Sequence, residues 1–532
     1  MGHKYAIDFG TTNSVIARWD ETKSAPEVIR LPIIGTDARA DLPPVVPTLL
    51  YVNDARTRAV TIGQTVRDHG LDQRADNRLF RNFKRGIVSS PAPDPRTIDS
   101  TAFADVDAGT QFLHLLMSAL PTKLDEIEQL VLTAPVASFE GYLTWLNNVI
   151  DSENVSEKIR IIDESTAAAL GYTITEPKAI VLVFDFGGGT LDLSLVELPE
   201  GRSTTGGFLR RLLRGSAAKH TARVIAKAGR VIGGSDVDQW LLTDVLKLAG
   251  VDTKTLGVHY TQLLTACEQA KIALSTQTSV TIQFQAGDKP YTVPYTREAL
   301  EALLEANGFY TSLRRVVDKV MHVARQRGIF KEDIRYVLLV GGTSLMPSVQ
   351  RTLQQYFNEM AVRADKPFTA VAEGALLVAA GYGLEDYLAH SYGIRHFDPA
   401  TQTHQYDEII PMGSRYPSEH PVEVYMGAAH PDQAEIEFVV GEIDSDSVAM
   451  IEVKYEEGQA VFVAQANSST QQIVTLNADT AALARLIPPG KPGQERLRAL
   501  FSVDDRRQLR LTVMDIQTDT LLLENAVVAS LR

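Results

Sequence analysis

Cysteine is nearly absent from this sequence, since its 532 residues include one, Cys267. A single thiol cannot form a disulfide within the chain, which is typical of a protein from a reducing compartment, and we expect a cytoplasmic location. Long apolar runs are absent too. No stretch approaches the ~20 apolar residues of a membrane span, and the opening MGHKYAIDFG lacks the basic and apolar regions of a signal peptide. We therefore expect no membrane partner.

An excess of basic residues is also missing. Lys and Arg number 52 against 66 Asp and Glu, which gives a net charge of -14. This balance disfavours binding to a phosphate backbone over a wide face, so we expect no nucleic-acid partner. One stretch, residues 202–230, is locally basic. It could contact an acidic partner, but we interpret it as a solvated excursion between two elements.

The length and the average composition, 44% hydrophobic and 22% charged, indicate a globular protein of two or more domains. Strands are predicted at YAIDF, QLVLTAP, AIVLVFDF, LDLSLVEL and YVLLVGG, and helices at 111–119, 140–149, 237–248, 260–274, 310–326 and 349–357. After residue 393, strand-like runs follow one another without a long helix, and 501–513 is typical of a hairpin. We predict an α/β domain at 1–383, a linker at 384–390 and an all-β sandwich at 391–532.

One arrangement occurs at two distant places, IDFGTTNS from Ile7 and FDFGGGTLD from Phe184. Each is an apolar run that ends in Asp and continues through Phe, glycine and hydroxyl residues. Such loops present backbone N–H groups that can cradle phosphate oxygens. A carboxylate beside phosphates makes sense when a hydrated Mg²⁺ lies between them, so we predict Asp8 and Asp185 on the metal side. The predicted phosphate-binding residues are Gly10, Thr11, Thr12, Asn13, Gly187, Gly188, Gly189 and Thr190. Either copy alone is more typical of a hairpin turn, whereas the matched pair favours the phosphate site.

Two more glycine pairs precede predicted helices, Gly233 and Gly234 in VIGGSDVD, and Gly341 and Gly342 in LLVGGTSLMP. They leave room for a nucleotide to approach the backbone closely. Neither has the lysine-bearing P-loop form or the G-x-G-x-x-G spacing, so those two nucleotide-binding folds are disfavoured.

In their order along the chain, these motifs resemble those of the heat-shock protein 70 (DnaK-type) chaperones. The loops IDFGTTNS and FDFGGGTLD resemble the two phosphate loops of that family, and VIGGSDVD resembles its Gly-Gly-Glu-Asp-Phe-Asp element. DESTAAALGY, EQAKIALS and LVGGTSLMP resemble its connecting motif, its adenosine-side helix and its adenosine motif. The resemblance implies an actin-like ATPase domain, with two lobes around a nucleotide cleft, followed by an all-β sandwich that binds polypeptide. It also implies ATP or ADP with Mg²⁺ as ligands, and extended polypeptide, a J-domain co-chaperone and a nucleotide exchange factor as partners.

The resemblance assigns a catalytic set as well, namely Lys84, Glu164, Asp185, Thr190 and Asp192. Lys84 in RLFRNFKRG matches a lysine that contacts the γ-phosphate and the attacking water, although taken alone it is typical of a surface lysine. Phosphoryl transfer to water needs charge neutralisation and an oriented water more than covalent chemistry, which suits one cation among carboxylates.

On the adenosine side, the resemblance implies contacts from Glu268, Lys271 and Ser275. Their spacing of i, i+3 and i+7 places them on one helix face, and an exposed polar face would give the same spacing. Leu345 stands where the family has an arginine that stacks on adenine, so the base would rest on apolar contact instead. Phe368 replaces part of an acidic pair, which could alter nucleotide affinity.

The predicted linker carries Glu385 and Asp386 where the family has an apolar run. The chain stops at Arg532, soon after the last strand-like run, so we expect no helical lid.

Three functions are compatible with these features. The first is an ATP-dependent, chaperone-like protein that hydrolyses ATP in the cleft and binds extended polypeptide through the β-domain. The second is an ATP-regulated scaffold with one dedicated protein partner. We rank a small-molecule kinase of the same fold lowest, because it gives no reason for a C-terminal β-domain.

Overall fold

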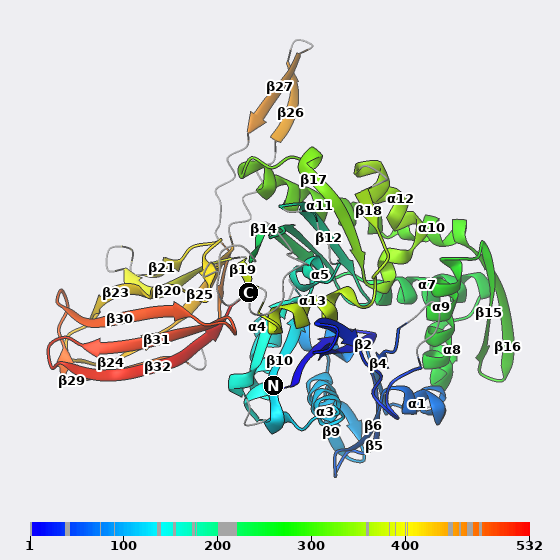
Figure 1. Ribbon diagram of the computed structural model, residues 1–532, viewed down its shortest axis with the longest axis horizontal. Helices are drawn as coiled ribbons and strands as arrows, with labels where there is room; N and C mark the ends of the chain where they lie inside the picture. The colour runs from blue at the N-terminus through cyan, green and yellow to red at the C-terminus, as the bar shows by residue number, and fades with distance from the viewer. Residues whose placement is uncertain are drawn as a thin grey trace. The chain divides into compact units, whose positions relative to one another are not determined.

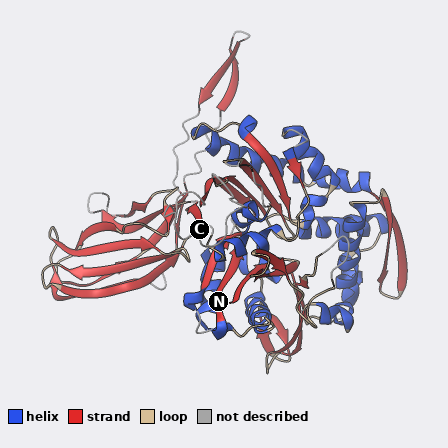
Figure 2. Cartoon of the chain, viewed as in Figure 1, coloured by secondary structure: helices blue, strands red, loops and turns tan. Residues whose placement is uncertain are grey.

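The structure is a computed structural model in which the chain divides into two compact units, Met1–Glu385 and Asp386–Arg532 (Figure 1). The division falls inside the segment predicted as a linker. The described residues are 3–37, 43–74, 76–89, 91–135, 140–152, 156–172, 176, 178–199, 221–357, 361–381, 383–388, 390–398, 401, 403–444, 451–456, 459–464, 472–477 and 481–531. Among these residues, the helices lie in the first unit, whereas the second is built of strands (Figure 2).

The first unit contains two sheets with the same topology. The sheet of the first lobe runs β11-β10-β1-β2-β3, and the sheet of the second lobe runs β18-β17-β12-β13-β14. In each, the central hairpin is antiparallel and a parallel strand joins its first member, β10 beside β1 and β17 beside β12. Their bounds are β1 His3–Phe9, β2 Asn13–Asp20, β3 Ala25–Val28, β10 Ile127–Ala134, β11 Ile159–Asp163, β12 Ile180–Phe186, β13 Leu191–Glu197, β14 Thr221–Arg230, β17 Ile334–Val340 and β18 Val362–Arg363.

The two loops singled out in the sequence occupy equivalent places in this repeat. Asp8 ends β1 and pairs with Val15 of β2, and Asp185 ends β12 and pairs with Asp192 of β13. The central strands are apolar and buried, so each aspartate stands at the end of a strand that packing holds in place.

Two helices cross between the lobes, α5 (Glu164–Gly171) and α13 (Ala370–Ala379). Helix α5 follows β11 of the first lobe and packs on β12 and β13 of the second, while α13 follows β18 and packs on β1, β2 and β10. Their backbones touch where they cross. A Cβ atom on Gly374 would fall far inside the van der Waals radius of the Ala167 carbonyl oxygen, and one on Gly171 would meet that of Ala370.

The remaining elements of the first unit cover these sheets and extend the lobes. Short strands β4 Val46–Pro47, β5 Leu49–Asp54, β6 Ala59–Ile62, β7 Leu79–Arg81, β8 Arg96–Ile98 and β9 Thr101–Phe103 belong to the first lobe with helices α1 Gln64–Asp68, α2 Phe83–Val88, α3 Asp105–Ser118 and α4 Glu140–Ser152. The second lobe adds the helices α7 Gly234–Ala249, α8 Thr253–Leu256, α9 Tyr260–Leu274, α10 Arg297–Ala306, α11 Phe309–Gln326 and α12 Pro347–Tyr356, and the hairpin of β15 Ser279–Ala286 and β16 Lys289–Thr296. The strands and helices predicted in this region are confirmed, with shifts of a few residues at their ends.

The second unit is built from antiparallel sheets around one apolar core. Its sheets run β21-β20-β25-β28 and β23-β30-β31-β32, and β24 pairs with β29. The bounds are β20 Ser391–Asp398, β21 Thr403–Ile410, β22 Arg415–Tyr416, β23 Val422–Gly427, β24 Gln433–Phe438, β25 Val440–Asp444, β26 Ile451–Glu456, β27 Gln459–Ala464, β28 Gln472–Thr475, β29 Ala482–Gly490, β30 Glu495–Val503, β31 Gln508–Asp515 and β32 Thr520–Ser530. The predicted hairpin is confirmed, because Phe501 pairs with Leu511 and Val503 with Leu509.

The segment between the units is a strand, β19 (Gly383–Tyr387). Residues 383–385 pair with β14 in the first unit, and residues 386–387 pair with β22 in the second. No helix in the described part of the chain is both long and apolar enough to cross a membrane.

The locally basic stretch is only partly described, because residues 202–220 lie outside the described residues. Its last part is strand β14, where Lys227 forms a buried ion pair of 2.7 Å with Asp163. Arg223 of the same strand pairs with Glu197 at 2.5 Å. The interpretation of this stretch as a solvated excursion is therefore wrong for β14, because a strand pairing and a buried partner hold it.

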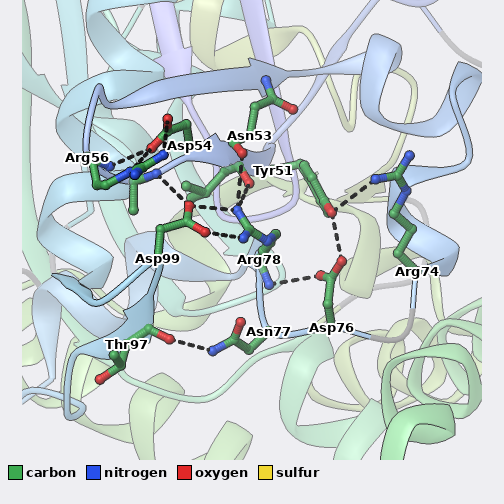
Figure 3. Close-up of polar contacts among 12 residues, drawn as sticks. Tyr51, Asn53, Asp54, Arg56, Arg74, Asp76, Asn77, Arg78, Thr97 and Asp99 are labelled. Atoms are coloured by element: carbon green, nitrogen blue, oxygen red, sulfur yellow. Dashed lines mark hydrogen bonds and ion pairs between the residues drawn. The ribbon is translucent and has the colours of Figure 1, made fainter.

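A polar network supports the small sheet of the first lobe (Figure 3). Arg78 donates two hydrogen bonds to the carboxylate of Asp99, and the Ala55 N–H donates to the same carboxylate at 3.0 Å. Tyr51 donates to Asp76 at 2.7 Å, and Asp76 also accepts from the Arg78 N–H at 3.0 Å. The hydrogen bond from Arg78 lowers the pKa of Asp99 from 3.8 to about 2.

We expect Gly374→Ala to lower the free energy of unfolding of the first unit by about 3 kcal/mol, because the obstacle is the backbone of α5 and cannot rotate away. Gly109→Ala in α3 is the matched control, because its Cβ would meet only the tips of Ile87 and Trp145, which can shift. Thermal unfolding of the two variants checks this. Equal melting temperatures would contradict the close crossing.

We expect Asp99→Asn to lower the melting temperature of the first unit at neutral pH. A depressed carboxyl pKa stabilises the fold above the ordinary value of 3.8, and this stabilisation is lost as the pH falls through about 2. The difference in melting temperature between wild type and variant should therefore shrink across that interval. A difference that does not change with pH would argue that Asp99 acts through shape and not through charge.

Candidate functional site

The two Asp-Phe-Gly loops face each other directly. A Cβ on Gly189 would lie 2.6 Å from the Thr11 hydroxyl, and one on Gly188 would clash with the Thr12 hydroxyl. Only glycine in the second loop leaves the space into which the first loop fits. The structure thus brings together two predicted loops that lie more than 170 residues apart in the sequence.

The other two glycine pairs line the second-lobe side of the same place. The N–H groups of Gly234 and Ser235 donate to the carbonyls of Gly187 and Gly188 at 3.0 and 2.9 Å. Thr343, which follows Gly342, donates to the Gly187 carbonyl at 2.8 Å. A Cβ on Gly341 would clash with the Phe186 carbonyl. The second Asp-Phe-Gly loop is therefore in contact with both predicted glycine motifs.

Four carboxylates gather at the loop ends, those of Asp8, Glu164, Asp185 and Asp192, and Lys84 lies among them. The exposed fractions are 4% for Lys84, 8% for Glu164, 7% for Asp185 and 0% for Asp192. Lys84 donates to Glu164 at 2.6 Å and to the Phe9 carbonyl. The alternative of a surface lysine is thus wrong, because α2 turns this side chain inward.

Burial in this cluster changes the protonation equilibria. It raises the pKa of Asp8 to about 7, with a further rise from Glu164, against the opposing effects of Lys84 and of the 2.9 Å hydrogen bond from Thr133. Burial, followed by Glu164, raises the pKa of Asp185 well above its ordinary value. For Lys84, burial lowers the pKa, but Glu164 and the other neighbours raise it more, so the ammonium stays charged. Carboxylates outnumber cations here, and burial followed by mutual repulsion disfavours their charged forms.

A hydrated magnesium ion would supply positive charge to this group of carboxylates. In the described residues, no three His, Cys, Asp or Glu side chains form a set that could hold a metal ion directly. Mg²⁺ usually keeps several waters and takes one or two carboxylates, which matches Asp8 and Asp185 on opposite loops.

The predicted adenosine-side residues lie on α9 and at its end. Lys271 donates to the Gly234 carbonyl at 2.9 Å and pairs with Asp238 at 2.8 Å, and Glu268 forms an ion pair with Arg81. Ser275 caps the helix, with its hydroxyl 3.5 Å from the Lys271 carbonyl oxygen. These side chains are not the exposed polar face that their spacing also allowed, since Glu268 is 7% exposed.

Apolar side chains line the other adenosine motif. Leu345 is half-buried at the end of the turn that follows Gly342. The ring of Phe368 approaches that turn, with its Cε1 3.5 Å from where a Cβ of Gly342 would lie.

Sequence reasoning missed several residues of the site. Arg81 and Arg85 flank Lys84, and each bonds across to the second lobe, Arg81 to Thr265 and Glu268, and Arg85 to Asp236 at 2.7 Å. The sequence feature that could have indicated Arg81 and Arg85 is their position beside Lys84 in RLFRNFKRG.

Tyr142 and Asp238 were also missed. Tyr142 lies in α4, with the Lys84 ammonium 5.6 Å from its ring centroid. Nothing in the local sequence marks it, because the lysine is 58 positions away. Asp238 was visible at the end of VIGGSDVD, and it pairs with Lys271.

Comparison with known proteins agrees with this geometry. The family model described as Hsp70 protein matches residues 154–396. The chaperone protein DnaK from each of two strains of Thermus thermophilus is 27% identical over 415 residues, a match that covers 71% of this chain. That match covers 61% of the length of each relative.

The fold is that of an actin-like ATPase domain followed by a β-sandwich, as predicted from the motifs. Over residues 154–396 the chain is similar to the Hsp70 family.

Proposed function

We propose that this protein binds and hydrolyses ATP in the cleft of the first unit and couples that cycle to the binding of extended polypeptide by the β-sandwich. The observation that carries the proposal is the direct opposition of two matched Asp-Phe-Gly loops above one buried lysine. ADP is the product that would stay bound in the same place. The match to the Hsp70 family model and the relatives named as chaperone proteins support the chaperone part.

Different residues of the cleft have different roles in phosphoryl transfer. Backbone N–H groups at Gly10 to Asn13 and at Gly187 to Thr190 cradle the phosphates, because these loops carry few bulky side chains. Lys84 neutralises charge that develops on the terminal phosphate, while Glu164 and Asp192 orient the attacking water. Asp8 and Asp185 would hold a hydrated magnesium ion. When bound, magnesium neutralises the phosphates and leaves fewer carboxylate charges uncompensated.

The adenosine end relies on different chemistry. Glu268, Lys271 and Ser275 offer polar groups to the ribose, and Gly233, Gly234, Gly341 and Gly342 let the nucleotide approach the backbone. Leu345 and Phe368 offer apolar contact to the base. This arrangement favours a base held by packing, with little contribution from a cation above its face.

A J-domain co-chaperone and a nucleotide exchange factor are the partners that this proposal adds to a polypeptide client. A cytoplasmic location stays a prediction, as do the domain boundaries 1–383, 384–390 and 391–532.

We expect Lys84→Ala to reduce steady-state ATP hydrolysis by about a hundredfold, which is typical of the loss of one electrostatic stabiliser. The affinity for ATP, measured by calorimetry with magnesium present, should change little. Lys4→Ala is the matched control, since Lys4 lies on the same lobe and pairs with Glu128 at the surface. Unchanged turnover in Lys84→Ala would remove this lysine from the mechanism.

The coupling to polypeptide is tested by measuring ATP hydrolysis with and without a panel of unrelated unfolded peptides. We expect a severalfold rise in rate with many of them, since two ligands that favour different states of one protein must influence each other. A response to no peptide would favour a scaffold with one dedicated partner. Phosphorylation of a metabolite in place of water would favour a kinase.

A further inference from the structure

The hydroxyl group of Tyr142 is an unexplained feature of the cleft. Tyr142 is 0% exposed, and its hydroxyl oxygen has no hydrogen-bond partner in the described part of the chain. Buried hydroxyls in native proteins are almost always bonded, and an unbonded one calls for an ordered water or a ligand atom. The Tyr142 hydroxyl therefore marks a position where a small polar group belongs.

The ammonium group of Lys84 points to the same position. An ammonium has three N–H donors, and Glu164 and the Phe9 carbonyl take two of them. Lys84 is also close enough to Tyr142 to lower the pKa of its hydroxyl, against the larger effect of burial. The Lys84 nitrogen lies 5.6 Å from the centroid of the Tyr142 ring, so the ammonium and the tyrosine are neighbours.

The surroundings limit what can occupy the space between them. The Lys84 nitrogen also lies 5.4 Å from the Phe9 ring centroid, so two aromatic rings enclose it. Asp8 and Glu164 are close enough to influence the protonation of Tyr142. Beside these buried carboxylates, a neutral water is favoured over a further anionic oxygen.

We propose that Tyr142 is a further positioning residue, which orients the water that attacks the terminal phosphate of ATP beside Lys84. Lys84 donates a hydrogen bond to this water, and the Tyr142 hydroxyl fixes its orientation. In the reaction, the water oxygen bonds to the terminal phosphorus and the bond from phosphorus to the bridging oxygen breaks. ADP keeps the bridging oxygen with its electron pair, one water proton stays on the phosphate product and the other is released. This inference rests on the proposed ATPase function.

The protonation state of the tyrosine is compatible with this role. Burial raises the pKa of Tyr142 above its ordinary value, although Lys84 opposes the rise. The hydroxyl is thus neutral at physiological pH, and it can orient a water without adding charge to the cluster.

The test replaces Tyr142 with Phe in the full chain, which removes the hydroxyl and keeps the ring. We expect kcat for ATP hydrolysis to fall about tenfold, less than for a charged stabiliser, because a neutral hydroxyl only orients the water. The dissociation constants for ATP and ADP should stay within about twofold, since the contact is to water and not to the nucleotide. The melting temperature without nucleotide should stay the same or rise, because no protein hydrogen bond is lost.

Tyr5→Phe is the matched control. Tyr5 is also 0% exposed and lies in the first lobe, but its hydroxyl is bonded to the Thr122 hydroxyl at 2.9 Å. This variant should show the opposite pattern, a lower melting temperature with unchanged turnover. A purely structural role for Tyr142 would make both variants behave alike.

The outcomes that overturn the inference are distinct. Turnover by Tyr142→Phe equal to wild type, in a wild type that hydrolyses ATP, overturns this inference alone. If Tyr142→Phe binds ATP more weakly but binds ADP as wild type does, the Tyr142 hydroxyl contacts an oxygen of the terminal phosphate. That result would contradict the proposed contact with water. A wild type without ATP hydrolysis would overturn the proposed function, and this inference with it.

Discussion

The contact between the backbones of α5 and α13 is the constraint on which the rest of the first unit depends. Each helix leaves the last strand of one lobe and packs on the sheet of the other, so the two lobes are tied at one crossing. The crossing is close because Gly171 and Gly374 have no side chains, and each faces a carbonyl of the opposite helix. Interiors pack densely and give little under added volume. The contact between α5 and α13 therefore fixes the position of the first Asp-Phe-Gly loop relative to the second.

Charge is the second organising element, and it follows from that geometry. Bringing the strand ends of two equivalent sheets together also brings their aspartates together, in a place from which water is largely excluded. Two of these carboxylates resist ionisation, and Lys84 remains charged because Glu164 lies 2.6 Å away. An arrangement of this kind is costly for an empty protein and favourable for one that binds a cation with an anionic ligand. The electrostatics of the cleft therefore favour a metal-bound polyphosphate over a neutral substrate.

Much of this architecture could be predicted from the sequence, because its signals are local. Apolar runs of strand length and apolar spacing of three and four residues located the central strands and the long helices, and the α9 prediction, 260–274, coincides with its observed bounds. The two Asp-Phe-Gly loops were recognisable because each holds its aspartate, glycine and hydroxyl residues within nine positions.

The contacts that were missed depend on residues distant in sequence. Lys84 is typical of a surface lysine until Phe9 and Glu164 are placed beside it, and these lie 75 and 80 positions away. Arg81 meets Glu268 across 187 positions. Lys227 appeared to belong to a solvated basic stretch, yet Asp163 holds it inside the protein from 64 positions away. No periodicity or motif encodes such pairs, because the two partners are joined only by the folded arrangement of both lobes.

The repeat between the two sheets is not symmetric in charge. Across from Asp8 the first hairpin has Val15, whereas across from Asp185 the second has Asp192. The second lobe thus carries a pair of acids to the shared boundary, and the first lobe faces it with Asp8 and Glu164 around the ammonium of Lys84. Moving the lobes apart relieves repulsion between carboxylates that lie in a poorly screened interior. Dissolved ions would weaken that repulsion as water entered, so the ionic strength of the medium acts as a control on how easily the two halves part.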